Sequence, residues 1–107
     1  MKGSTSVFAS RLKSARQAKG LSQEELGVRA GIEEFSARQR IYQYENGVHT
    51  PHFEMAEKIA DVLGIPTALL YSRRDDEADM LCLFHSMSED SKKRLLTLAK
   101  TNSGNHN

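Results

Sequence analysis

Apolar residues recur every three or four positions through most of this chain, which is the spacing of helices that bury one face. Gly20 and Gly64 stand directly after two such stretches, where a left-handed residue commonly caps a helix. Thr50 and Pro51 have the residue types of an N-cap and a first helical position. The pattern predicts an all-α fold, with helices over about residues 5–19, 51–63, 66–71, 77–86 and 88–100 and two more within residues 21–47. The core positions expected in the first and fourth helices are Phe8, Leu12, Ala15, Met55, Ile59, Val62 and Leu63.

The stretch from residue 21 to residue 47 predicts a helix, a turn and a second helix. Ser22 and Glu25 form a capping box, in which the hydroxyl and the carboxylate each bind a backbone N–H of the other residue. Gly27 falls in the middle of the first helix, where glycine costs about 1 kcal/mol relative to alanine. We therefore expect another helix to cross Gly27 too closely for a larger side chain. Gly31 is expected to end the helix in the turn.

A second capping box, from Ser36 to Gln39, predicts where the next helix begins. Ile41 and Tyr44 are three residues apart and are expected to face inward. The side chains left for the other faces are Arg38, Gln39, Arg40, Tyr42 and Gln43. Arginine can bind guanine bidentately and glutamine can bind adenine, so this short helix suits the major groove of DNA.

These residues resemble a known family. Leu21–Leu26 (LSQEEL), Ala30–Ile32 (AGI) and Tyr44–Gly47 (YENG) are similar to the helix-turn-helix domain of phage repressor and Cro proteins, the XRE-type family. The resemblance runs from about Phe8 to Tyr71 and implies a five-helix, lambda-repressor-like DNA-binding bundle. Gly31 and Glu45 are farther apart than is usual in the family. The extra residues fall in 33–36, so we expect a lengthened turn.

The resemblance also implies roles for residues around the second helix. Arg38, Gln39 and Gln43 match positions that touch base edges, and Arg40 and Tyr42 flank them. Gln23 matches a glutamine that binds a phosphate. The other expected DNA contacts are Asn46, His49 and Thr50. They resemble a second group of family residues that bind the phosphate backbone. Arg16 matches an arginine that forms a structural ion pair, here with Glu45.

Charge is distributed in a way that fits this interpretation. The net charge is only +1, but residues 1–50 carry eight Lys/Arg against five Asp/Glu, whereas residues 51–107 carry seven against nine. The basic half therefore contains the predicted DNA-binding motif. The positive electrostatic field that attracts DNA can also include Lys13, Lys19 and Arg29. We expect Glu33 and Glu34 to point away from DNA.

The sequence after residue 72 predicts a separate extension. Residues 72–76 are polar and mark the boundary between a DNA-binding domain (1–72) and a C-terminal two-helix hairpin (73–107). The first helix of the hairpin is apolar nearly all round, so it should be covered on more than one side. Residues 95, 98 and 99 form the stripe of the second helix, which Ser88 caps. We expect dimerisation through residues 77–100, with packing onto the same chain as the alternative.

Other chemistry has little support in the sequence. His49/His52 and Cys82/His85 have ligand spacing, but the pairs fall in different parts of the chain, so no metal site is expected. We also find no nucleophile motif or Gly-rich phosphate loop, and expect neither enzymatic activity nor a cofactor. The single cysteine and the lack of a long apolar run favour a cytoplasmic protein without a membrane span. Residues 1–4 and 101–107 are expected to be disordered.

The function predicted is a sequence-specific, dimeric transcriptional repressor that binds double-stranded DNA through the major groove. The alternative is a protein-interaction module, or antitoxin-type adaptor, that keeps the fold but binds a protein partner through the apolar extension.

Overall fold

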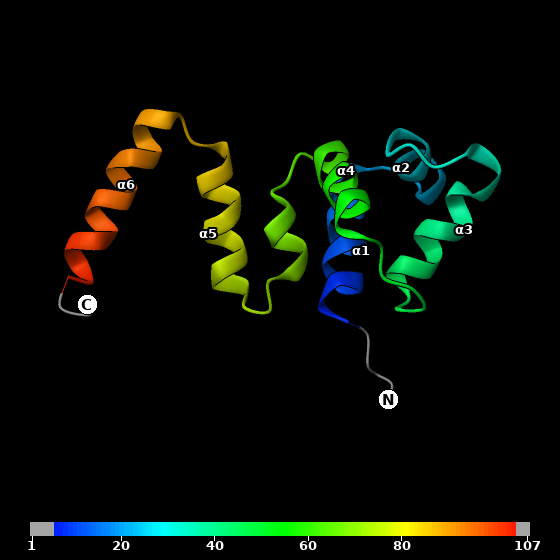
Figure 1. Ribbon diagram of the computed structural model, residues 1–107, viewed down its shortest axis with the longest axis horizontal. Coiled ribbons are helices and arrows are strands. Elements are labelled where there is room, and N and C mark those ends of the chain that lie inside the picture. Colours follow the sequence, from blue (N-terminus) through cyan, green and yellow to red (C-terminus); the bar gives the residue numbers. More distant parts are fainter. Residues whose placement is uncertain (1–5, 105–107) are drawn as a thin grey trace.

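The computed structural model describes residues 6–104, and these residues are helical with no β-strand among them. The elements are α1 (Val7–Lys19), α2 (Gln23–Arg29), α3 (Glu34–Glu45), α4 (Phe53–Leu63), the 3₁₀ helix η1 (Thr67–Tyr71), α5 (Asp75–Ser86) and α6 (Glu89–Asn102). Helices α1 to α4 and η1 cluster together, while α5 and α6 continue along the long axis of the molecule (Figure 1). The expected all-α fold is confirmed, and the shape is elongated, with extents of 52 × 33 × 22 Å.

The helix starts that a serine cap defines agree with the sequence. Ser6 caps α1 by accepting the Ala9 N–H at 3.0 Å, so this helix begins at Val7; the expected start at Thr5 lies outside the described residues. Ser22 caps α2 with the complete box, and Ser88 caps α6. Gly20, Gly31, Gly47 and Gly64 all have positive φ, as expected at helix ends.

The predicted start of α3 is wrong. Ser36 does not cap this helix: α3 begins two residues earlier at Glu34, with Glu33 at the N-cap position and no side-chain cap. The turn between α2 and α3 is therefore only residues 30–33, and the lengthened turn is wrong as well. The extra residues continue the helix: Ala37, which directly follows the expected cap at Ser36, is fully buried within α3.

Two other boundaries differ from the pattern. α4 begins at Phe53 rather than Pro51, because Pro51 is buried in the preceding loop and the first helical bond runs from the Ala56 N–H to the His52 carbonyl at 3.0 Å. α5 begins at Asp75, so the linker is shorter than 72–76. η1 begins one residue after Pro66. At the other end, residues 101–102 belong to α6 rather than to a disordered tail, and residues 105–107 and 1–4 lie outside the described residues.

One apolar core joins the first four α-helices and η1. Its largest fully buried side chains are Leu12, Leu26, Ile41, Ile59 and Leu70, one from each of these elements. The core closes where α2 crosses α3: a Cβ built on Gly27 would lie 2.7 Å from the Ala37 Cβ. The close crossing expected at Gly27 is confirmed, and it determines how tightly the two helices of the motif pack.

The C-terminal helices pack differently from the prediction. α5 buries only Ala78 and contacts η1, although its sequence led us to expect cover on more than one side. α6 buries no residue and lies beyond α5, away from the bundle (Figure 1). Large apolar side chains therefore remain exposed on both helices, namely Met80, Leu83, Leu96 and Leu98. Over the described residues, no helix is both long and apolar enough to cross a membrane.

Candidate nucleic-acid interface

Helix α3 has one face in the core and another in solvent. Its buried residues are Ala37, Ile41, Tyr44 and Glu45. Of the five side chains expected to read DNA, Arg38, Gln39, Arg40 and Tyr42 are exposed and Gln43 is half-buried. Arg38, Gln39 and Tyr42 line one shallow pocket on this surface. The structure thus leaves donors and acceptors for base edges on the accessible side of the helix.

A buried ion pair fixes the C-terminal end of α3. The Arg16 guanidinium donates to both oxygens of the Glu45 carboxylate, with Nη2 and Oε1 3.0 Å apart, and its Nη1 also donates to the Leu21 carbonyl at 2.9 Å. The Glu45 side chain is only 1% exposed. Hydrogen bonding to Glu45 raises the pKa of Arg16, so the guanidinium stays charged. Three segments, α1, the loop before α2 and α3, are therefore held in one geometry.

Gln23 joins the same network. Its amide nitrogen donates to the Glu45 Oε1 at 3.1 Å, which places the side chain at the junction of α2 and α3. The amide oxygen has no bond in the network, and Gln23 is half-buried at the first position of α2. In this position Gln23 couples the N-terminus of α2 to the end of α3.

Other expected contact residues are partly engaged within the protein. Arg40 donates to the Tyr44 hydroxyl at 3.3 Å, on the flank of α3. Asn46 donates to the Tyr42 carbonyl at 2.8 Å and so closes the end of the helix. His49 and Thr50 are exposed in the loop that follows, between α3 and α4. The structure brings these residues together around α3, at its flank, its end and the next loop.

Two features of the structure, one on α3 and one away from it, escaped the sequence analysis. Phe35, in the first turn of α3, is 86% exposed, the most of any large hydrophobic side chain among the described residues. The signal was its helical spacing from Gln39 and Tyr42, which the wrong start of α3 concealed. The second feature is Arg11, which joins α1 to the start of α5.

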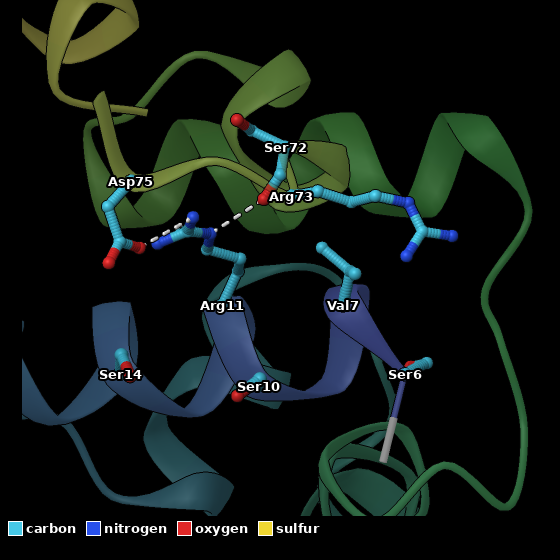
Figure 2. Close-up of a pocket in the computed structure, with 8 residues that line it drawn as sticks. All are labelled: Ser6, Val7, Ser10, Arg11, Ser14, Ser72, Arg73 and Asp75. Atoms are coloured by element: carbon cyan, nitrogen blue, oxygen red, sulfur yellow. Dashed lines mark hydrogen bonds and ion pairs between the residues drawn. The ribbon is translucent and has the colours of Figure 1, made fainter. Parts of the chain in front are cut away.

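Arg11 connects the bundle to the C-terminal helices. Its Nε donates to the Ser72 carbonyl at 2.9 Å and its Nη2 lies 3.1 Å from the Asp75 Oδ1. Figure 2 shows both contacts along a polar pocket between α1 and the linker, with the Arg73 side chain extending away from Arg11. This contact joins α1 to the start of α5.

The metal-ligand pairs considered above do not come together with further ligands. Within residues 6–104, no group of three or more His, Cys, Asp and Glu side chains is placed to hold a metal ion. His49 and His52 lie between α3 and α4, and Cys82 and His85 lie on α5.

A tight two-helix crossing, an ion pair that fixes the second helix and an accessible basic and amide face together define a helix-turn-helix DNA-binding protein. The chain belongs to the helix-turn-helix family, whose sequence model matches residues 12–70.

Two relatives support this membership. The cryptic phage CTXphi transcriptional repressor RstR of Vibrio cholerae is 28% identical over 97 residues, which span 86% of this chain and 84% of that protein. The crystal structure of the transcriptional regulator BswR matches with a TM-score of 0.79 and 38% identity, over 87% of this chain and 92% of that chain. The protein is therefore a DNA-binding transcriptional regulator and not an enzyme.

Proposed function

We propose that this protein is a sequence-specific repressor that inserts α3 into the major groove of operator DNA in the cytoplasm. In this proposal Arg38, Gln39 and Gln43 contact base edges, and Arg40 and Tyr42 contact bases or phosphates beside them. The phosphate contacts are Gln23, Asn46, His49 and Thr50. The observation that carries the proposal is the exposed position of Arg38 and Gln39 on a helix whose Ala37, Ile41, Tyr44 and Glu45 are buried.

The network around Glu45 supports the roles given to Gln23 and α3. A helix that reads bases has to be held at a fixed angle, because base contacts depend on geometry while phosphate contacts set the register. Arg16 and Gln23 both bind the carboxylate at the end of α3. The Gln23 amide nitrogen carries two N–H donors, so one can bind Glu45 while the other donates to a phosphate.

We further propose that residues 1–72 form the DNA-binding domain and that residues 73–107 form a dimerisation arm. The support is the set of exposed apolar side chains on α5 and α6, which the described residues 6–104 leave uncovered. Apolar side chains left exposed together on a surface commonly mark a protein interface. Twofold dimers of helix-turn-helix proteins bind half-sites about 34 Å apart, so an operator of near-palindromic sequence follows.

The same exposed surface also favours a second candidate, in which the arm binds a different protein. In that case the regulator would be an antitoxin-type adaptor as well as a DNA-binding protein. The mass of the isolated protein in solution distinguishes dimerisation from binding of a different protein. An arm that pairs with a second copy of itself gives a dimer without any other component.

Selection of bound sequences from random duplexes tests the groove-reading proposal. We expect a near-palindrome with half-sites about one helical turn apart. Arg38→Ala should lower affinity for the selected site about tenfold or more while leaving nonspecific binding nearly unchanged, because a bidentate base contact is worth about 1–3 kcal/mol.

Arg73→Ala is a matched control that removes an exposed arginine outside α3. An equal loss of affinity for all sequences in Arg38→Ala would contradict base reading by this residue and indicate a phosphate contact.

A further inference from the structure

Phe35 projects from the first turn of α3 and is left almost uncovered by the part of the chain that the structure describes. Its exposed fraction is 86%, compared with 53% for Tyr42 on the same helix. A phenyl ring so exposed gives up favourable burial, at about 25 cal/mol for each Å² of apolar surface left in water. A binding partner that covered this ring would recover that burial.

Phe35 lies on the DNA-facing side of α3. At about 100° per residue, Phe35 is within about 40° of Gln39 and about 20° of Tyr42 around the helix axis. The buried Ala37 and Ile41 lie about 160° and 120° away. Phe35, Gln39 and Tyr42 therefore form one stripe along α3, and Phe35 extends this stripe toward the N-terminus by about 6 Å.

The acidic residues near Phe35 do not share its side of the helix. Glu34 lines a pocket with Glu24, Glu25 and Val28 of α2, so its carboxylate lies toward α2. Glu33 precedes the helix as its N-cap residue. The ring of Phe35 can thus approach DNA with Gln39 while Glu34 stays on the α2 side.

We propose that Phe35 is a specificity-determining residue that packs against the 5-methyl group of thymine in the major groove. The proposal rests on the proposed reading of DNA by α3. Phenylalanine has no hydrogen-bonding group, so it cannot bind a phosphate or a polar base edge. The thymine methyl is the apolar group that bases present in the major groove, and phenylalanine is one of the side chains that contact it. A protein partner on Phe35 would cover the same stripe as Gln39 and Tyr42 and would prevent groove reading.

Replacing thymine with deoxyuridine tests this contact, because it removes the methyl group and keeps base pairing. The probe is the duplex recovered by selection, with each thymine changed singly, and affinity is measured by fluorescence anisotropy with the full chain. For the unchanged protein we expect about fourfold weaker binding at one or two neighbouring thymines of each half-site. In Phe35→Ala that uracil penalty should vanish, and affinity for the unmodified duplex should fall by a similar factor.

Phe53→Ala is the matched control, since it removes another exposed phenyl ring (57%) that belongs to α4. It should retain the uracil penalty, and circular dichroism should show both variants folded. A penalty of equal size in Phe35→Ala, or no sensitive thymine in the unchanged protein, would overturn the proposal. Two other results would instead contradict the proposed insertion of α3 into the major groove. In the first, the selection recovers no specific sequence; in the second, Arg38→Ala keeps full sequence specificity.

Discussion

At the scale of single residues, Gly27 and Glu45 show how the motif keeps its geometry. Gly27 permits α2 to cross the backbone of α3 at a distance that no side chain allows. At the other end of α3, the Glu45 carboxylate accepts hydrogen bonds from Arg16 and Gln23. One residue therefore sets the distance between the helices, and the other sets the angle of α3.

Gly27→Ala tests the crossing. A Cβ at this position would lie 2.7 Å from the Ala37 Cβ and 2.9 Å from its carbonyl oxygen, so backbone has to move. The strain of overpacking, about 1–3 kcal/mol, should exceed the gain in helix propensity of about 1 kcal/mol. Urea unfolding should show a net loss of stability, whereas Val28→Ala on the exposed side of α2 should change it by less than about 0.5 kcal/mol. A more stable Gly27→Ala protein would contradict the close crossing.

Glu45→Ala tests the buried network. The change leaves the Arg16 charge without its partner, in a side chain that is 12% exposed. Breaking such a pair typically costs about 3–5 kcal/mol, so we expect a loss near the lower end of that range in urea unfolding. The control is Arg94→Ala, which breaks an exposed pair with Asp90 and should cost at most about 0.5 kcal/mol. Equal effects from the two variants would show that the Glu45 network contributes no more than a surface ion pair.

At the scale of elements, the short helix α2 depends on its ends. It has only seven residues, which is too few for a stable isolated helix. Its box satisfies two backbone N–H groups: the Ser22 N–H donates to Glu25 at 2.8 Å and the Glu25 N–H donates to Ser22 at 3.0 Å. The helix is also held in place by Leu26, which is fully buried in the core.

The capping box makes α2 sensitive to acid. Hydrogen bonds from the Ser22 backbone and side chain lower the pKa of Glu25 from its ordinary value of 4.5. Because the folded-state pKa is the lower one, this contribution to stability is complete above pH 4.5 and is lost as the pH falls through the folded-state pKa. An NMR titration should give a pKa for Glu25 below 4.5 in the unchanged protein and closer to 4.5 in Ser22→Ala.

Ser22→Ala should also lower the melting temperature by a few degrees at neutral pH, through loss of the N-cap. Glu25→Gln serves as the control, because the amide oxygen can still accept the Ser22 N–H but does not titrate. This variant should lose less stability than the unchanged protein over the same acidic range. Identical acid sensitivity of the two proteins would show that the Glu25 carboxylate does not contribute.

At the scale of the whole molecule, we propose that the arm formed by α5 and α6 joins two copies of the chain. Arg11 orients the arm through Ser72 and Asp75. Lys92 of α6 lies over the Phe84 ring of α5, with its nitrogen 5.3 Å from the ring centroid. Apolar side chains of both helices remain in solvent, so association can bury them without unfolding the bundle.

Sedimentation equilibrium tests this role for the arm. The unchanged protein should sediment at twice the 12.0 kDa chain mass. Leu98→Glu should shift it to the monomer, because a charge would be placed in the apolar interface, and affinity for the full palindrome should fall with little change for an isolated half-site. Val28→Glu alters an exposed apolar residue of α2 and should leave the mass unchanged. A monomeric mass for the unchanged protein at high concentration would remove dimerisation from the proposed function.

Several features of this fold depend only on residues that are neighbours in the chain. The caps at Ser22 and Ser88, the left-handed glycines and the inward positions of Ile41 and Tyr44 follow from neighbouring residues, and each was predicted. The start of α3 was not predicted, since Ser36 has the right residue type for a cap but is the third residue of a helix that begins at Glu34 and buries Ala37. Phe35 was missed for the same reason.

The sequence alone determined the helical class, the family and the identity of the polar side chains on α3, because periodicity, caps and residue chemistry act over a few neighbouring positions. Only the tertiary structure decided that the residues before Ser36 are helical and that Gln23 binds Glu45. It also decided that α5 and α6 extend away from the bundle. The first two outcomes depend on contacts of α3 with α2, such as Ala37 against Gly27 and Glu45 with Gln23, which outweigh the weaker local preference for a cap at Ser36. The third reflects how little of α5 and α6 is buried against the bundle.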